Sequence, residues 1–538
     1  MQLKETSPFL SGSGIPIQRV YGPKDTAGVD YARDLGEPGE APFTRGIYPN
    51  MYRGKLWTIR RYSGFGTPRD TNQLYRREFE LGQTGISIAF DSVTESGLDS
   101  DDPRAEHDVG AGGVPVDSLL DMEEMFEGIP IEKVSTAIIT QTLSSPPIHA
   151  MYFALAEKRG LDVSRLDGTT QADLTTALGC LQLIDQVPPA PALRLCIDLI
   201  EWCCQVAPRW HPVSFDSYNY RENAANAYQE LGLLLATAIG YIEEARRRGR
   251  VPLEKFVRPF SFNMGCHNDF FEEIAKFRAG RRMWYKILHD RYGVTDPRCL
   301  QFRFHAQSSG CTHTYQEPLN NLMRIAYQVM ACALGGAQSV HANGYDEGLC
   351  LPTEESMLLS IRTEQILQHE TNIINTADPL GGSYYIEWLT SEVERRTWEY
   401  IKQIEDMGGI VRALETGWVH REFKNAFWEY ENRVNRGEVK VVGVNTFQLS
   451  GQQQPQPVPI FRPNPQAAQV QKEKLLKLRR ERDNARVEKA LQGLEAVSRS
   501  SENVMPAVME AAKAYATLGE ICGVWRKLWG IWRYPMGV

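Results

Sequence analysis

The chain has 538 residues, of which 42% are hydrophobic and 23% are charged, and its formal net charge is −8. This length is sufficient for a large domain with accessory segments, and the composition is typical of a globular protein. The acidic balance argues against a general nucleic-acid-binding protein, so any basic binding site must be local.

Sequence patterns also bear on the compartment. No apolar run approaches the roughly 18 residues that a membrane span needs, and the N-terminal segment MQLKETSPFLSGSG has no signal-peptide pattern. We therefore expect a cytoplasmic protein without membrane association. The ten cysteines are scattered and include no CxxC pair, which indicates reduced structural thiols rather than disulfide bonds or a zinc site.

The N-terminal segment and the region after it differ in pattern. Residues 1–45 are rich in Gly, Pro, Ser and Asp and show no sustained periodicity, which predicts an extended arm or, alternatively, disorder. From residue 46 to about 415, short apolar runs alternate with amphipathic stretches. Predicted buried strands are ISIAF (86–90), VSTAIIT (134–140), PVSFDSY (212–218) and LQFRFHAQ (300–307). Predicted covering helices are 151–160, 226–249 and 270–293. This alternation favours an α/β fold with a parallel sheet.

Residues 416–538 are predicted to form a linker and a helical segment. A proline-rich connector occupies residues 457–466, and a charged helix is expected over 470–497. A second helix is expected over 504–532, and it carries Trp525, Trp529 and Trp532. These tryptophans fit either a surface that docks a partner or an internal core.

The stretch YPNMYRGKLWTIRRYSGFGT, residues 48–67, is the most informative part of the sequence. Basic side chains alternate there with aromatic rings, and glycines interrupt any regular period. Cations interleaved with rings suit a ligand that carries phosphates and a flat base. A solvated loop anchored by its aromatic residues is the alternative interpretation.

This stretch resembles the substrate-entry segment of the adenosylcobalamin-dependent acyl-CoA mutases, the methylmalonyl-CoA mutase family. The likeness continues, in family order, through GQTGISIAFDSVTESGLDSDDP (82–103), RFHAQSSG (303–310), GGAQSVHANGYDE (335–347), DPLGGSYYIE (378–387) and VVGVN (441–445). The resemblance implies an α/β (β/α)8 TIM barrel over residues 46–415, with the active site at the carboxyl ends of the strands. It also implies that the arm (1–45) and the helical segment (416–538) contact a partner.

The resemblance further implies how the cofactor is bound. The family's cobalamin-binding domain carries a D-x-H-x-x-G motif, and none of the ten histidines here has an Asp two positions before it. We therefore expect the large, catalytic subunit of a two-chain enzyme, organised like the isobutyryl-CoA mutase-type large subunits. A separate small subunit would supply the cobalt ligand for adenosylcobalamin, in an α2β2 heterotetramer. A G-protein chaperone is an additional expected partner.

The resemblance also assigns site residues. Expected contacts of the coenzyme A arm and phosphates are Tyr48, Met51, Lys55, Thr58, Arg60 and Arg298. The residues expected to line the barrel and contact the substrate are Thr140, Thr169, Gln171, Ser214 and His305. The alternative is that these polar side chains form hydrogen bonds within the protein interior and do not contact the substrate. Expected catalytic residues are Tyr62, whose ring would lie against the acyl group, and Gln171, Tyr218 and Asn219. Expected cofactor contacts are Ala89, Phe90, Glu222, Gln307, Gly310, Gln338, Asn343 and Glu347.

Three departures from the family pattern fall in the expected acyl pocket. Leu181 stands where the family has an Arg that pairs with a substrate carboxylate, and a buried carboxylate without a cation would cost several kcal/mol. Asn219 replaces a His that donates to the thioester carbonyl, and Asn263 replaces an aromatic residue. Dicarboxylic acyl groups are therefore unlikely substrates. The 2-hydroxyisobutyryl-CoA mutases have Ile and Asp where this chain has Tyr62 and Ala89, which disfavours that substrate too.

The leading hypothesis is a mutase that performs a radical 1,2-rearrangement of an uncharged, nonstandard acyl-CoA. Two alternatives remain open from the sequence. A catalytically silent scaffold subunit would explain the loss of the Arg and the His. A mutase acting on a carrier-protein-bound acyl thioester would explain a rebuilt pocket equally well.

Overall fold

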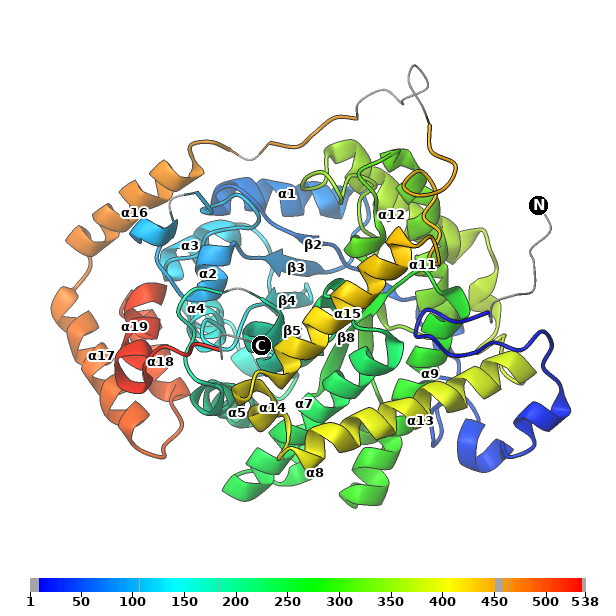
Figure 1. Ribbon diagram of the computed structural model, residues 1–538. Helices are drawn as coiled ribbons and strands as arrows, with labels where there is room; N and C mark the ends of the chain where they lie inside the picture. Colours follow the sequence, from blue (N-terminus) through cyan, green and yellow to red (C-terminus); the bar gives the residue numbers. More distant parts are fainter. Residues whose placement is uncertain (1–8, 106, 182, 450–457, 463, 535–538) are drawn as a thin grey trace.

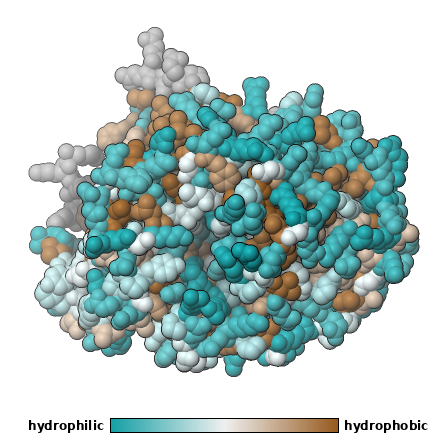
Figure 2. Space-filling model, turned by 180° about the vertical axis from the view of Figure 1, so that it is seen from behind, coloured by the Kyte–Doolittle hydropathy of each residue, from teal (hydrophilic) through white to brown (hydrophobic). Residues whose placement is uncertain are grey.

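The computed structural model describes residues 9–105, 107–181, 183–449, 458–462 and 464–534 (Figure 1). Residues 1–8 of the predicted arm, and residues 457 and 463 of the predicted connector, lie outside this part. No helix of the described chain is long and apolar enough to cross a membrane. Figure 2 shows that the face opposite to Figure 1 is largely hydrophilic, with hydrophobic residues scattered among polar ones.

The strands are short, and every pair of them in the described chain is parallel. They form two sheets, with the orders β1-β10-β9-β8-β7 and β2-β3-β4-β5-β6. Their bounds are β1 Thr58–Ile59, β2 Tyr62–Ser63, β3 Ile86–Ala89, β4 Thr136–Ile139, β5 Gly168–Gln171, β6 Trp210–His211, β7 Ser214–Asp216, β8 Ser261–Cys266, β9 Phe304–Ser308 and β10 Ser339–His341. All four residues of β3 are buried, as expected for a parallel sheet covered on both faces.

The two sheets continue into each other. Only Arg60 and Arg61 separate β1 from β2, and only Pro212 and Val213 separate β6 from β7. β1 pairs with β10 while β2 pairs with β3, and β6 pairs with β5 while β7 pairs with β8. The order of pairing thus returns to its start, as a parallel (β/α)8 barrel requires. The predicted α/β class with parallel strands is confirmed.

The helices lie outside the strands (Figure 1). Those of the central region are α1 Pro68–Glu80, α2 Ser92–Ser96, α3 Leu119–Met125, α4 Ser145–Lys158, α5 Pro189–Val206, α6 Tyr218–Glu222, α7 Ala227–Arg248, α8 Leu253–Val257, α9 Phe270–Lys286, α10 Pro297–Leu300, α11 Asn321–Leu334, α12 Glu354–His369, α13 Tyr384–Asp406, α14 Ile410–Glu415 and α15 Trp418–Asn435. The helix predicted over 151–160 begins earlier, at Ser145, and the one predicted over 270–293 is α-helical only to Lys286, whereas the boundaries predicted for α7 hold. Asn226 caps its first turn, and Gly249 ends it in the left-handed conformation that glycine adopts without strain.

The described part of the N-terminal arm packs on its own chain. Ser11 donates a hydrogen bond to Glu272 of α9, and Arg281 of the same helix donates to the Phe43 carbonyl oxygen. The Tyr21 ring lies 4.7 Å from the Trp388 ring of α13. These contacts contradict the alternative of disorder for residues 9–45.

Each of the two predicted C-terminal helices is two helices, which corrects that prediction. They are α16 Ala467–Glu481, α17 Asn484–Arg499, α18 Met505–Lys513 and α19 Leu518–Trp529. The Asp483 side chain accepts from the Arg486 backbone N–H and starts α17, and Thr517 starts α19 in a capping box. Both capping residues lie inside segments that the sequence predicts as single helices. Trp525 is fully buried, so at this position the internal-core interpretation is correct.

Candidate active site

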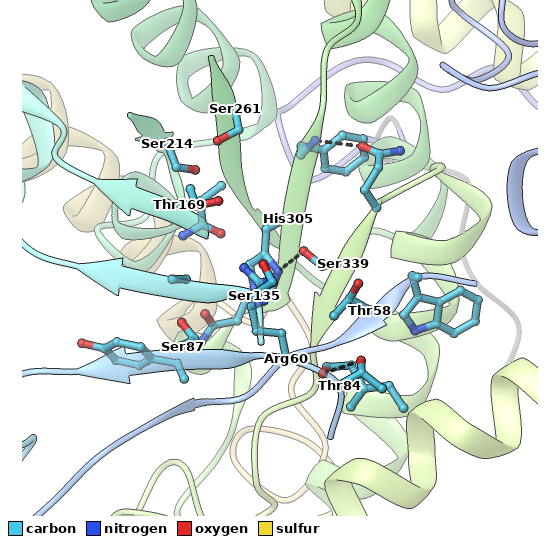
Figure 3. A pocket seen from close by; sticks show the side chains of 18 of the residues that line it. Thr58, Arg60, Thr84, Ser87, Ser135, Thr169, Ser214, Ser261, His305 and Ser339 are labelled. Carbon is cyan, nitrogen blue, oxygen red and sulfur yellow. Dashed lines mark hydrogen bonds between the residues drawn. The ribbon is translucent and has the colours of Figure 1, made fainter. Parts of the chain in front are cut away.

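A cavity of about 1070 Å³ lies inside the ring of strands. Every strand contributes at least one lining residue, for example Thr58, Tyr62, Ser87, Ala137, Thr169, His211, Ser214, Ser261, His305 and Ser339. Figure 3 shows small polar side chains from opposite strands converging on this space. Short hydroxyl side chains leave room for a long ligand and offer it hydrogen bonds along its length.

The two ends of the cavity differ in charge. We call the residues that precede the strands the amino rim; its charged members are Lys55, Glu132, Lys133, Asp167, Arg209 and Arg303. We call a set of lining residues at the opposite end the carboxyl rim; they are Tyr62, Glu95, Gln141, Gln171, Leu181, Tyr218, Asn219, Asn263 and Gln307. Among the described residues, no Lys or Arg lines the carboxyl rim.

Arg60 is a cation inside the ring that forms no ion pair with any described residue. Its guanidinium donates to the Ser135 hydroxyl at 2.7 Å, and its Nε has no hydrogen-bond partner there. A Cβ at Gly85 would lie 3.1 Å from that Nε, which explains why a glycine precedes β3. Burial lowers the pKa of Arg60 to about 10, so it remains charged at neutral pH. A half-buried cation that has no ion pair and lines a cavity favours an anionic ligand.

The residues predicted to contact coenzyme A divide into two groups. Lys55, Thr58 and Arg60 line the cavity, whereas Tyr48, Met51 and Arg298 do not. Met51 is buried beneath the rim, and Arg298 is exposed, with its carbonyl oxygen accepting from Arg303. Tyr48 is 40% exposed and lies close enough to raise the pKa of Arg303 against the lowering effect of burial.

Arg303, Arg209 and Lys133 belong to the amino rim but were not predicted as site residues. Each of them lies directly before a strand or a few residues before one. That position is the sequence signal that could have identified them as residues of the cavity entrance. Gln338 also precedes its strand, β10, and lines the amino rim. Its amide accepts from the Phe304 backbone and donates to Gly336, so Gln338 lies at the opposite end from the other predicted cofactor residues.

Tyr62 and Glu95 mark one side of the carboxyl rim. The Tyr62 backbone N–H donates to His341 Nδ1 at 2.7 Å, which fixes the start of β2. Burial raises the pKa of Tyr62 well above its usual range, and the Glu95 and Asp216 carboxyls add to this effect. Burial also raises the pKa of Glu95 to about 8, with Asp91 and Asp216 adding and Gln141 opposing. Glu95 is therefore largely a neutral acid at pH 7, able to donate as well as accept.

Asp216 organises the other side of the carboxyl rim. Its Oδ2 accepts from Asn219 Nδ2 at 2.6 Å and from the Thr176 hydroxyl at 3.0 Å. Its Oδ1 accepts from Asn263 Nδ2 at 2.8 Å and from the Tyr218 backbone N–H at 3.2 Å. Burial raises the pKa of Asp216, and these donors oppose the shift. The fold thus brings together Asn219 and Asn263, which the sequence separates by more than forty positions.

The remaining predicted lining residues have distinct environments. Gln171 accepts from Asn263 Nδ2 at 3.4 Å, and its own amide nitrogen meets no acceptor in the described chain. Leu181 follows the π-helix Thr176–Cys180 and lines the cavity. Thr140 does not; it is buried and donates to the Gln171 carbonyl oxygen at 3.1 Å, which ties the end of β4 to β5.

Three of the eight predicted cofactor residues, Glu222, Gly310 and Glu347, lie together just beyond the carboxyl rim. A Cβ at Gly310 would lie 3.1 Å from Glu222 Oε2, 3.1 Å from the Tyr218 hydroxyl and 3.4 Å from Glu347 Oε1. The Cys311 backbone N–H donates to Glu222 at 2.6 Å. Burial raises the pKa of Glu222 to about 8 and that of Glu347 to about 7.

The remaining predicted cofactor residues, apart from Gln338, have separate contacts. Gln307 donates to Asn343 Oδ1 at 3.0 Å. Ala89 ends β3, and Phe90 bridges to Val114; both are buried and neither lines the cavity.

Several buried polar atoms near Gly310 have no hydrogen-bond partner in the described chain. They are Glu222 Oε1, Ser309 Oγ, both ring nitrogens of His313 and Asn343 Nδ2. Buried polar groups are normally hydrogen-bonded, so such a concentration favours a large polar ligand at this place. A corrin ring, with amide side chains around its edge, is a group of that kind, and the residues present fit it.

A cavity ringed by parallel strands, with cations at one end and neutral polar groups at the other, is typical of the binding site of an enzyme. Comparison with known proteins identifies the family, because the methylmalonyl-CoA mutase model matches residues 10–531. The chain is 38% identical to the 2-hydroxyisobutanoyl-CoA mutase large subunit of Aquincola tertiaricarbonis, over 98% of this chain and 92% of that protein. It is 37% identical to the methylmalonyl-CoA mutase of Cereibacter sphaeroides, over 98% of this chain and 74% of that protein. The chain therefore belongs to the methylmalonyl-CoA mutase family, whose members are isomerases.

Proposed function

We propose that this chain is the large subunit of an adenosylcobalamin-dependent mutase that rearranges the carbon skeleton of an uncharged acyl-CoA. The observation that carries the proposal is Arg60, a half-buried cation without an ion pair in the described chain, inside a cavity to which every strand contributes. The phosphates and the long pantetheine arm of coenzyme A match a cationic entrance that leads into a channel of hydroxyl groups.

The neutral acyl group is argued from the carboxyl rim. Leu181 lies there in place of a cation, and the charged or chargeable acids of this end are the carboxyls of Glu95, which lines it, and Asp216, which lies behind it. A carboxylate on the acyl group would lose its hydration and gain no partner, which costs several kcal/mol. Methylmalonyl and ethylmalonyl groups are thus poor candidates.

The cofactor would be held beyond the carboxyl rim by Glu222, Gln307, Gly310, Asn343 and Glu347. When bound, adenosylcobalamin supplies a carbon-centred radical through homolysis of its cobalt–carbon bond. The Glu347 carboxyl can accept hydrogen bonds from a ribose diol. The backbone of Tyr62 is held by its hydrogen bond to His341. The Tyr62 ring would cover the reacting group from the β2 side and exclude water.

Gln171 is the donor that we assign to the thioester carbonyl. Its amide nitrogen has no acceptor in the described chain, while its Oε1 is turned toward Asn263. Asn219 is less suited to that task because one of its N–H groups is held by Asp216 at 2.6 Å. The sequence suggested Asn219 as a replacement for the family His; the contacts favour Gln171.

A separate small subunit would provide the cobalt ligand. Two relatives are described as large subunits, those of Aquincola tertiaricarbonis and Streptomyces virginiae, which supports a partner of this kind. An α2β2 assembly and a G-protein chaperone are part of the same proposal.

The test is formation of cob(II)alamin. The chain is mixed with its small subunit, adenosylcobalamin and single acyl-CoAs, and the radical signal is followed by EPR. We expect a signal with at least one uncharged acyl-CoA and none with methylmalonyl-CoA. If no thioester gives an EPR signal although the small subunit binds, the mutase proposal is overturned and a scaffold role is favoured. If only acyl-carrier-protein thioesters give a signal, the substrate is carrier-bound.

A further inference from the structure

The carboxyl rim contains one acid whose side chain reaches the cavity. Among the described residues, Glu95 is the only carboxyl that lines this rim, and it is partly exposed there. Asp91, Asp173 and Asp216 are fully buried and do not line the cavity. A ligand at this end of the ring of strands can therefore meet one carboxyl group directly, and that group belongs to Glu95.

Hydrogen bonds from two neighbouring segments fix the position of Glu95. Its backbone carbonyl oxygen accepts from the Ser144 hydroxyl at 3.1 Å. The next residue of α2, Ser96, accepts at its Oγ from the Ile184 backbone N–H at 3.1 Å. Ile184 follows Leu181 by three positions, so the acid is held beside the segment that brings an apolar side chain to the same rim.

No positive charge compensates the Glu95 carboxyl. The groups that act on it are Asp91, Gln141 and Asp216, and none of them is a cation. Burial is the main reason why the pKa of Glu95 rises to about 8; the two aspartates add to the shift and Gln141 opposes it. Tyr62, which the Glu95 charge also reaches, stays neutral because burial raises its pKa well above the usual range. Glu95 is therefore largely neutral at pH 7 and largely a carboxylate at pH 9.

We propose that Glu95 determines the charge selectivity of the carboxyl rim, because its carboxylate repels an acyl group that carries a negative charge. This proposal rests on the mutase function proposed above and adds a dependence on pH to its substrate class. An uncharged acyl group binds equally well to either form of Glu95. A carboxylated acyl group in the same place binds only when Glu95 takes up a proton, since two carboxylates in contact in a partly buried site cannot both be ionised. The preference for uncharged acyl groups therefore increases with pH.

Leu181 and Glu95 act differently on a carboxylated acyl group. Leu181 offers the carboxylate no partner at any pH, so it contributes a constant loss of affinity. Glu95 adds a repulsion only in its ionised form. For a group with a pKa near 8, the protonated fraction falls about tenfold between pH 7 and pH 9, and the affinity for a carboxylated acyl group falls with it.

The experiment compares isobutyryl-CoA with methylmalonyl-CoA, in which a carboxylate replaces one methyl group, by isothermal titration calorimetry at pH 7, 8 and 9. The protein is the full chain assembled with its small subunit, and coenzyme A alone is the reference. We expect the ratio of the isobutyryl-CoA affinity to the methylmalonyl-CoA affinity to increase about tenfold between pH 7 and pH 9. Titrations at pH 9 in buffers with different heats of ionisation should show that methylmalonyl-CoA takes up about one proton more than isobutyryl-CoA.

The outcomes separate this inference from the proposed function. If both thioesters bind and their affinity ratio does not change with pH, the role of Glu95 alone is overturned. If coenzyme A and both thioesters fail to bind, the proposed mutase function is overturned instead.

Two variants assign the effect to a residue. Glu95→Gln has nearly the same shape but cannot ionise, so its affinity ratio should be the same at all three pH values and the additional proton uptake should disappear; binding of coenzyme A reports that the variant is folded. The matched control is Glu132→Gln, because Glu132 is an exposed glutamate that lines the same cavity at the amino rim. It should keep the tenfold increase. An increase that survives in Glu95→Gln, or one that is lost in Glu132→Gln, would contradict the assignment to Glu95.

Discussion

The amino rim and the carboxyl rim belong to one cavity but present opposite chemistry. At the amino rim, four of the six charged residues are cations, and Arg60 extends this positive charge into the ring. At the carboxyl rim the lining is amide, phenol, leucine and a protonated carboxyl. One end suits the constant, anionic part of an acyl-CoA, and the other suits a neutral acyl group.

The architecture allows this difference. Amino-rim residues lie on segments that enter the strands, and most carboxyl-rim residues lie on segments that leave them. These are separate stretches of chain, so one end can be rebuilt without disturbing the other. The departures from the family pattern, Leu181, Asn219 and Asn263, all lie at the carboxyl rim. This distribution is explained most simply if the chain binds a different acyl group from its relatives but binds coenzyme A in the same way.

The largest effect is expected at Arg60. Arg60→Met keeps the length of the side chain but removes the unpaired cation, and we expect coenzyme A to bind at least about thirtyfold more weakly. Calorimetry on the variant provides the measurement. Arg480→Met is the control, because Arg480 is 75% exposed on α16. If Arg60→Met binds coenzyme A as tightly as the parent chain, the amino half of the cavity is not the coenzyme A binding site.

A second variant would reverse the selectivity of the carboxyl rim. Leu181→Arg places a cation beside the acyl group, and we expect methylmalonyl-CoA to gain about tenfold in affinity relative to isobutyryl-CoA. Leu181→Met, which changes shape but not charge, should leave that ratio unchanged. If both variants behave alike, the acyl group does not reach Leu181.

A third prediction concerns pH and Glu95. Its pKa is raised from an ordinary 4.5 to about 8, so the folded protein holds a proton that the unfolded chain releases above pH 4.5. Its stabilising contribution is complete below that pH and is lost as the pH rises toward 8, with a slope of at most about 1.4 kcal/mol per pH unit. Glu95→Gln should remove this component from the free energy of unfolding measured by urea titration between pH 5 and 8.

Glu481→Gln is the matched control for that series, since Glu481 is 54% exposed. It should leave the pH dependence as in the parent chain. A Glu95→Gln curve that runs parallel to the parent curve would mean that Glu95 is ionised in the folded protein.

The smallest effect is expected at Arg298. The sequence assigns it to coenzyme A, yet it is exposed and outside the cavity. Arg298→Met should weaken coenzyme A binding by less than about threefold, because exposed ion pairs contribute about 0–1 kcal/mol. Arg303→Met, the neighbouring change inside the rim, should weaken it more. The reverse order of the two variants would place the nucleotide on the outer surface.

Sequence reasoning succeeded where local pattern decides the outcome. The apolar runs at 86–90 and 134–140 became β3 and β4, because continuous apolar segments of this length are buried as parallel strands. Leu181, Asn219 and Asn263 were recognised as members of one pocket, and all three line the carboxyl rim.

Sequence reasoning failed where contacts between distant residues decide. Asp216 lies in the quoted segment DSYN, but its effect depends on accepting from Asn219 and Asn263 together, which no spacing reveals. Gln338 was assigned to the cofactor because its block was, although it precedes β10 and lies at the amino rim. The end of the strand at which a residue lies determines which ligand it can contact, more than the sequence motif to which it belongs.

The most direct test of the two-rim account is an experimental structure of the protein with an uncharged acyl-CoA bound. We predict the phosphates among Lys55, Lys133, Arg209 and Arg303, the pantetheine arm past Arg60, and the acyl group in contact with Leu181, Asn219 or Asn263. A thioester bound in the opposite direction, or with its acyl group outside the ring of strands, would contradict the account.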